Sequence, residues 1–219
     1  MVDFTTCAET KSGNIRTPKC RLSYVYLETP NPKAKITSGN NAGKFKYTVS
    51  LLIPKSSNID MLKKAAEAVA IEEFGAEKFK GLVEAGKFNT PFLDAFKASR
   101  TEKNPSGDER MRDFTLIRTD SMTKPGILES NGQSIGDDYS GVYAGRWAFA
   151  TLNASAYPSI DGGKPGVKFY LGNIQLLDHD ERLGGGRPNA EDEFEPVNVA
   201  GGEAASTDSV FGNESSGVL

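Results

Sequence analysis

The sequence has few of the residues that enzymes and metal sites most often use. Its 219 residues include one histidine, His179, and two cysteines, Cys7 and Cys20. The cysteines lack both CxxC spacing and histidine partners, so no zinc site is expected. The sequence also lacks a G-x-S-x-G elbow and a G-x-x-x-x-G-K-[ST] loop, which argues against a nucleophilic hydrolase and a nucleotide-driven motor. We therefore expect a binding protein rather than an enzyme, without metal or cofactor.

Long apolar runs are missing as well. No stretch reaches the roughly 18 apolar residues of a membrane-spanning helix. The first residues also lack an apolar run long enough for a signal peptide. We therefore expect a cytoplasmic protein.

Basic residues are absent from the C-terminal end. All 26 Lys and Arg lie at or before Arg187, whereas 188–219 has a formal charge of −7 and the remaining 22 acids and 26 bases give the rest of the chain +4. This end has few large apolar side chains, so it cannot bury enough surface to offset the entropy of ordering. We expect a disordered acidic tail over 188–219. A tethered anion of this kind can compete for whatever anion the cationic part binds.

The rest of the chain, 1–187, has the composition of a single β-rich domain, with 23 glycines and 11 prolines in the whole sequence that indicate many turns. Alternation of apolar and polar residues predicts five strands, at about 21–28, 44–53, 114–118, 146–152 and 167–178. The second strand is the clearest. Its odd positions from Phe45 to Ile53 are apolar and its even positions from Lys44 to Ser50 are polar.

A helical insertion is predicted at about 57–98. Apolar residues recur at helical spacing over 58–74, with Ser57 and Asp60 at the spacing of a capping box. Weaker helical patterns follow at about 79–83 and after Thr90-Pro91.

Two loops and a domain boundary follow from polar and glycine-rich segments. The charged stretch 99–113 and the Gly-, Ser- and Asp-rich stretch 119–145 are predicted as loops. Three glycines before Arg187-Pro188 can extend neither a helix nor a central strand, which predicts the end of the domain there.

Basic and aromatic residues share the predicted outer faces of several strands. Tyr24 and Tyr26 lie on one face of the first strand, and Lys168 and Tyr170 on one face of the last. Bases stack on aromatic rings for about 1–3 kcal/mol each without sequence readout, while Lys and Arg neutralise phosphates. This pattern is typical of a surface for single-stranded nucleic acid. The candidate residues are Tyr24, Tyr26, Lys44, Lys46, Arg112, Arg118, Arg146, Trp147, Lys168 and Tyr170. Trp147 is either such a platform or a core residue.

Two other functions stay open. Acidic pairs and clusters at Asp137-Asp138 and 178–181 allow a Mg²⁺-dependent nuclease, although acids adjacent in polar loops are usually solvated. A recombination mediator or interaction protein that meets DNA only through a partner is the other alternative.

Two segments resemble signature blocks of a known family. They are 139–157, with the sequence YSGVYAGRWAFATLNASAY, and 166–177, with the sequence GVKFYLGNIQLL, followed by RLGG at 182–185. They are similar to the tailed-phage single-stranded-DNA-binding proteins of OB-fold type that carry an acidic C-terminal tail. The resemblance implies a mostly β protein, a five-stranded OB-fold barrel with an α-helical insertion. It also implies non-specific binding of single-stranded DNA in phage replication and recombination, in the cytoplasm of an infected bacterium.

The same resemblance adds site residues and partners. It places Tyr143 with Arg146 and Trp147 near the binding face. It also implies that the tail recruits phage or host replication and recombination proteins, through Glu191, Asp192, Glu193, Glu195, Asp208 and Phe211. A standard OB-fold has its helix between strands three and four, whereas the helix predicted here follows strand two, so either one strand is missing from the prediction or the barrel has an insertion.

Overall fold

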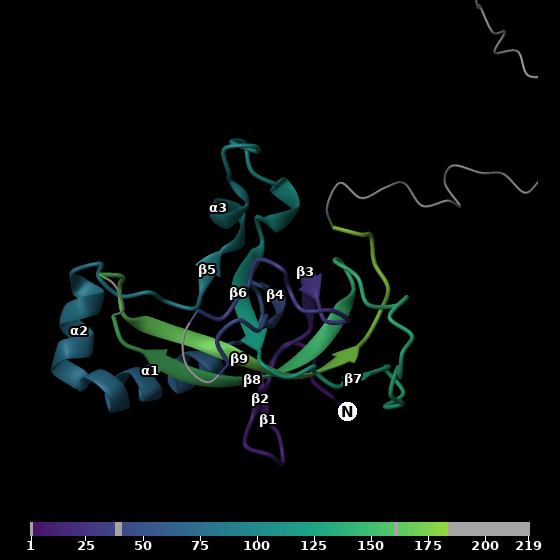
Figure 1. Ribbon diagram of the computed structural model, residues 1–219, viewed down its shortest axis with the longest axis horizontal. Helices are drawn as coiled ribbons and strands as arrows, with labels where there is room; N and C mark the ends of the chain where they lie inside the picture. Colours follow the sequence, from purple (N-terminus) through teal and green to yellow (C-terminus); the bar gives the residue numbers. More distant parts are fainter. Residues whose placement is uncertain (1, 38–40, 160–161, 184–219) are drawn as a thin grey trace, which may run out of the picture. The chain divides into compact units, whose positions relative to one another are not determined.

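The computed structural model describes residues 2–37, 41–159 and 162–183 (Figure 1). The described strands are β1 (Ala8–Glu9), β2 (Ile15–Arg16), β3 (Cys20–Tyr26), β4 (Tyr47–Pro54), β5 (Leu93–Asp94), β6 (Phe114–Ser121), β7 (Ile127–Leu128), β8 (Trp147–Tyr157) and β9 (Gly166–Leu176). The helices are α1 (Asp60–Phe74), α2 (Ala76–Glu84) and α3 (Ala95–Ser99), with a 3₁₀ turn at Glu109–Met111. The prediction of a mostly β chain is confirmed.

The five long strands pair in a cycle. β3 pairs with β4, β4 with β6, β6 with β9, β9 with β8, and β8 again with β3. The β6–β9 pair is parallel and the other four are antiparallel. All five of these strands are predicted by alternation. The four short strands are not, because two residues give no periodicity to recognise.

Alternation along each long strand divides a core from an outer face. Val49, Leu51 and Ile53 of β4 are buried in one apolar cluster, together with Phe169 of β9. Helix α1 adds its buried face to the same cluster and contacts β8 and β9. The intervening residues of β4 point the other way. Of these, Thr48 and Ser50 are polar, whereas Leu52 is buried in a second, smaller apolar cluster.

The insertion between β4 and β6 contains the predicted helix, but its start differs in detail. The side chain of Asn58 accepts the backbone N–H of Asp60 at 2.9 Å, and the N-cap residue of α1, Ile59, makes no side-chain cap. The predicted Ser57 cap is therefore wrong, because the side-chain oxygen of Asn58 accepts the N–H at the start of the helix instead. Helix α2 starts after Gly75, whose φ of 79° favours glycine at the turn between the two helices.

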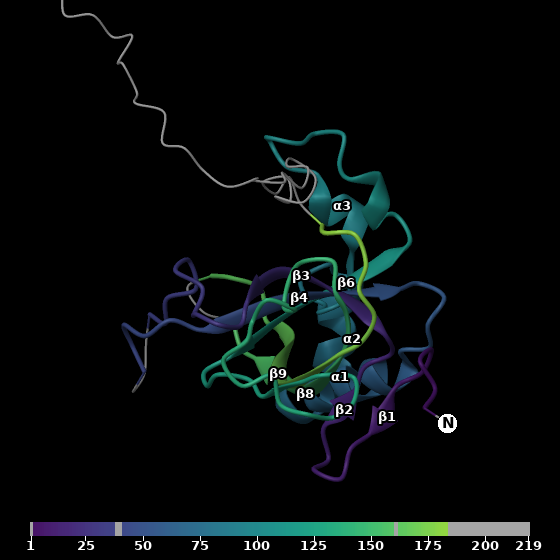
Figure 2. The same cartoon turned by 90° about the vertical axis from the view of Figure 1, so that its right-hand side faces the viewer.

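The third helical segment begins later than predicted. The chain after Thr90-Pro91 forms β5, and α3 starts at Ala95 with the carboxylate of Asp94 accepting the backbone N–H of Lys97 at 2.9 Å. The helix therefore starts after the Asp94 cap, and the preference of Pro91 for the first turn of a helix does not decide its start. In Figure 1, α3 lies beside β5 and β6, and both views (Figures 1 and 2) show it apart from α1 and α2.

The two predicted loops are partly ordered elements. Residues 99–113 include the 3₁₀ turn, and 119–145 includes the end of β6 and the short β7. Within the described residues, no helix is long and apolar enough to cross a membrane. The described domain belongs to a unit that spans Met1–Gly184. The predicted tail, 188–219, lies outside the described residues.

Candidate nucleic-acid interface

The outer face of β3, β4, β6 and β9 is built from rows of residues that pair across strands. One row joins Ser23, Ser50 and Arg118, and in it the two serines are buried and the arginine is exposed. The two serines are small and do not project from the sheet, whereas Arg118 places an exposed positive charge beside them.

The next row carries the rings and charges of this face. It joins Tyr26, Thr48, Asp120 and Tyr170 through the strand register. We call the outer surface formed by these two rows and their neighbours the open face. Its members from the predicted set are Tyr24, Tyr26, Lys46, Arg118, Lys168 and Tyr170.

One carboxylate holds two lysines on the open face. Asp120 Oδ2 lies 3.3 Å from Lys46 Nζ and 3.4 Å from Lys168 Nζ. Lys168 Nζ also lies 4.1 Å from the centre of the Tyr170 ring. Burial alone would lower the pKa of Lys168, but hydrogen bonding to Tyr170 and the charge of Asp120 hold that pKa above its usual value. Lys168 is therefore a fixed positive charge beside an exposed ring.

The apolar end of the same surface is covered. Leu52 of β4 and Leu116 of β6 pair across the strands and pack with Ala95 of α3 and with Leu183. The insertion and the end of the described chain therefore close this end of the sheet, and the open face begins at the serine row.

Three predicted residues lie in a second place, against the segment 178–183 that follows β9. We call this place the closed corner; it comprises Tyr143, Arg146 and Trp147 with that segment. The indole N–H of Trp147 donates to Asp180 Oδ2 at 2.7 Å. The Tyr143 ring lies 6.0 Å from the ring of His179, and Tyr143 Oη donates to the carbonyl of Asp180 at 3.2 Å.

Two basic residues that the prediction did not select also belong to the closed corner. Lys19 pairs with Asp178 at 2.5 Å, and Arg21 donates to the Glu181 carbonyl at 2.6 Å and lies 3.5 Å from Asp180. Arg21 is the first residue of the predicted strand at 21–28, so the alternation of that strand was a signal that could have placed it on the outer side. Nothing in the sequence indicated that 178–181 would fold back onto it.

Arg146 is a buried part of the closed corner. Its side chain is 4% exposed, contacts both ring nitrogens of His179 and lies 3.6 Å from the carboxylate of Glu129. Gly145 has a φ of 110°, and a Cβ there would collide with the carbonyl oxygen of Glu181. The 178–183 segment is therefore packed closely against this part of the chain.

The charges of the closed corner favour ionised aspartates. The backbone N–H of Glu181 and the Trp147 indole lower the pKa of Asp180, with help from Arg21 and Lys19. Lys19 likewise lowers the pKa of Asp178. Both carboxylates therefore stay negative at neutral pH and remain partners for the nearby cations and the indole.

The last two predicted nucleic-acid residues lie in neither place. Arg112 pairs with Glu109 at 2.7 Å and lies over the Phe96 ring at 4.2 Å. Lys44 donates to Asn41 Oδ1 at 3.1 Å in the β3–β4 connection. The predicted tail residues lie outside the described part of the chain.

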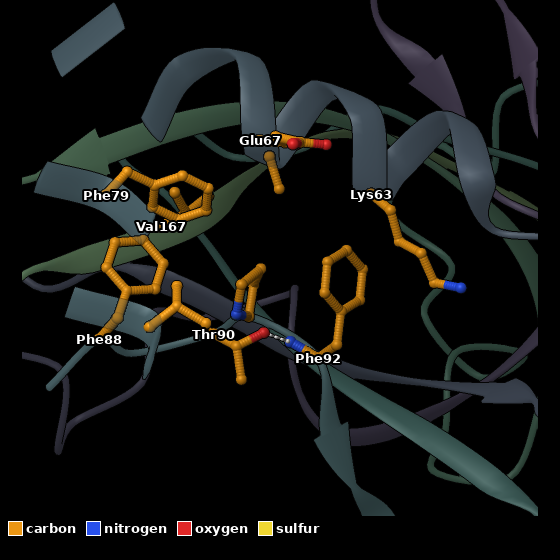
Figure 3. Close-up of a pocket in the computed structure, with 10 residues that line it drawn as sticks. Lys63, Glu67, Phe79, Phe88, Thr90, Phe92 and Val167 are labelled. Carbon is orange, nitrogen blue, oxygen red and sulfur yellow. Dashed lines mark hydrogen bonds between the residues drawn. The ribbon is translucent and has the colours of Figure 1, made fainter. Parts of the chain in front are cut away.

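A separate apolar cavity of about 460 Å³ lies between α1, α2 and the chain before β5 (Figure 3). Phe79, Phe88 and Phe92 surround it, with Lys63 and Glu67 of α1 on one side. None of the predicted nucleic-acid residues lines it. Within the described ranges, no group of three His, Cys, Asp or Glu side chains is arranged to hold a metal ion.

A family model described as the ssDNA-binding protein of Enterobacter phage Enc34 matches residues 13–208. The chain belongs to this family. The resemblance noted from 139–157 and 166–177 is thereby confirmed, and so is the expectation of a binding protein rather than an enzyme. No curated protein sequence matches the chain.

Solved structures of phage proteins share the fold. The single-stranded DNA-binding protein of bacteriophage Enc34 in complex with ssDNA aligns with a TM-score of 0.62 at 17% identity, over 84% of this chain and 97% of that one. A C-terminal truncation of the Enc34 protein gives 0.55 at 18% identity, over 84% and 95%. The gp2.5 single-stranded DNA-binding protein of bacteriophage T7 gives 0.52 at 14% identity, over 85% and 97%.

Proposed function

We propose that this protein binds single-stranded DNA through the open face, without sequence preference and without chemical change to the strand. The arrangement of Lys168 against both Tyr170 and Asp120 is the observation that carries the proposal. It puts a cation for a phosphate next to a ring for a base. Membership of a family named for ssDNA binding supports the same function.

We further propose that the pairing cycle is an OB-type barrel. In chain order its strands are β3, β4, β6, β8 and β9, so that the third and fifth strands are the parallel pair. The helical segments then form an insertion between the second and third strands. OB-folds bind oligonucleotides on the face of strands two and three, which here are β4 and β6. The open face includes the outer side of both.

Binding would combine stacking with phosphate neutralisation. Exposed tyrosines offer ring faces to unpaired bases, and Arg118, Lys46 and Lys168 neutralise phosphates. Asp120 offsets part of this charge in the free protein. A phosphate that approaches the two lysines has to share them with that carboxylate, which moderates affinity.

The biological role proposed here is protection and handling of single strands in phage DNA replication and recombination, in the cytoplasm of an infected bacterium. The tail over 188–219 carries a formal charge of −7. We propose that it competes with DNA for the cations of the domain 1–187 and recruits replication or recombination proteins.

Direct binding tests the function. Fluorescence anisotropy of a labelled oligo(dT) with the full-length protein, at low and high salt, should show tight binding that weakens as salt rises. Absence of binding at low salt, for both the full-length and tail-deleted proteins, would contradict the proposal and favour a mediator that needs a partner. Shortening of the labelled strand in the presence of Mg²⁺ would instead indicate a nuclease.

Deleting 188–219 tests the role of the tail. The shortened protein should bind oligo(dT) more tightly at low salt and nearly as the full-length protein does at high salt, because screening weakens the competing anion. Equal affinities at low salt would show that the tail does not compete.

A further inference from the structure

The β3–β4 pair contains a bulge on the open face. Ser23 pairs with Ser50 and Tyr26 with Thr48, so Tyr24 and Val25 together stand opposite the single residue Val49. Val25 packs against the core. Since Ser23 belongs to an outer row, regular alternation would turn Tyr24 toward the core. As the extra residue of the bulge, Tyr24 is exposed instead.

The backbone at Tyr24 is in an unfavourable conformation. Its φ of 48° makes it the one non-glycine residue with positive φ in the described part of the chain. A left-handed conformation is strained for a tyrosine, whereas glycine adopts it freely. The ring gains no burial in return, because Tyr24 is 73% exposed, more than any other large apolar or aromatic residue described.

We propose that Tyr24 is the residue that makes the open face select single strands over duplex DNA. This inference rests on the proposed function and concerns its specificity. The bulge places an exposed ring in the chain between Ser23 and Tyr26, which belong to the two rows of the open face. Backbone strain at an exposed aromatic residue is typical of binding sites.

The physical basis of the selectivity is the difference between charge and stacking. Phosphates are present in both forms of DNA, so Arg118 and Lys168 attract both. A base inside a duplex already has neighbours on both of its faces. Only an unpaired base can offer a face to the Tyr24 ring, so the ring adds affinity for single strands alone.

Four variants of the full-length protein separate these contributions. Y24F keeps the ring, Y24A removes the ring and keeps the strain, Y24G removes both, and R118A removes a cation of the same face. Each is titrated against a labelled oligo(dT) and a duplex of equal length over a range of salt, and its denaturant midpoint is measured.

The expected result is a loss specific to single strands. Y24A and Y24G should lose roughly tenfold in oligo(dT) affinity, with unchanged duplex affinity and an unchanged salt slope. Y24F should bind as the wild type does. Y24G should have a higher denaturant midpoint than Y24A and the wild type, because glycine relieves the backbone strain. R118A should lose affinity for both forms, with a salt slope smaller by about 0.7 for the single strand.

Two results would overturn the inference in different ways. If R118A weakens oligo(dT) binding and Y24G does not, the open face is still the binding site, but the proposed role of Tyr24 is wrong. If the wild type binds oligo(dT) and neither R118A nor Y24G weakens it, the open face is not the binding site and the proposed function must be located elsewhere.

Discussion

The open face and the closed corner have the same kinds of side chain and differ in what meets them. On the open face, two lysines share one carboxylate, and Tyr24 and Tyr170 are 73% and 37% exposed. In the closed corner, Trp147, Arg146 and Tyr143 each contact a residue of 178–183. A pattern of basic and aromatic residues therefore does not by itself distinguish an open surface from one that another segment of the same chain already contacts.

Removing Arg146 should reveal the structural role of the closed corner. Arg146→Ala is expected to lower the free energy of unfolding by roughly 3 kcal/mol, because a buried, hydrogen-bonded charge is lost. The side chain of Arg112 is 57% exposed, so Arg112→Ala is the matched control and should change stability by under about 0.5 kcal/mol. Denaturant unfolding followed by circular dichroism gives both values. Equal stability of the two variants would contradict the distinction.

Removing charge from the open face should affect binding instead. The double variant R118A/K168A is expected to lose roughly tenfold or more in oligo(dT) affinity, and its salt slope should fall by about 1.4, since each phosphate contact contributes about 0.7. Arg112→Ala, which removes a cation outside the open face, should leave that slope nearly unchanged. Anisotropy titrations over a range of salt measure both, and an equal drop in slope for Arg112→Ala would show that net charge alone is responsible.

Neutralising Asp120 should strengthen DNA binding by the open face. Asp120→Asn frees Lys46 and Lys168 from their shared carboxylate and removes a negative charge from the face. Oligo(dT) affinity is expected to rise about threefold at low salt, because a phosphate no longer shares the two lysines with a carboxylate. The gain should vanish at high salt, where screening weakens these charge interactions. Weaker binding by this variant would mean that Asp120 positions the lysines rather than competing for them.

Acid should loosen the closed corner with a small effect. Asp180 has a depressed pKa, so its contacts stabilise the fold above the ordinary value of 3.8 and are lost as pH falls through the lower folded value. Protonation weakens its attraction to Arg21 and Lys19 and its bond to the Trp147 indole. The tryptophan emission of the wild type should shift in this acidic range. Asp180→Asn should lack the shift, and its presence in that variant would assign it to another group.

The sequence predicts the five long strands and α1 because each has a long periodic pattern. It misses β1, β2, β5 and β7, which are too short for periodicity, and the Asn58 interaction at the start of α1, which depends on a local choice between adjacent polar side chains. The sequence also predicts that the helical insertion follows the second long strand, because the helical spacing of apolar residues begins soon after that strand ends.

The candidate site could be predicted only in part. Alternation along strands brings Tyr26, Arg118, Lys168 and Tyr170 to one face, because register preserves the side of each residue. It could not show that Tyr24 sits in a bulge, since a bulge is set by pairing between strands. Nor could it show that His179 and Asp180 would return to Arg146 and Trp147, because that contact depends on tertiary packing.

Photo-crosslinking tests the central claim most directly. A single-stranded oligonucleotide that carries 5-iodouracil at each position is bound to the full-length protein, irradiated and digested, and the crosslinked peptides are identified by mass spectrometry. Crosslinks should fall on Tyr24, Tyr26 and Tyr170 of the open face. Crosslinks confined to Tyr143 and Trp147 would contradict the account, since they would require the strand to displace 178–183 and bind in the closed corner.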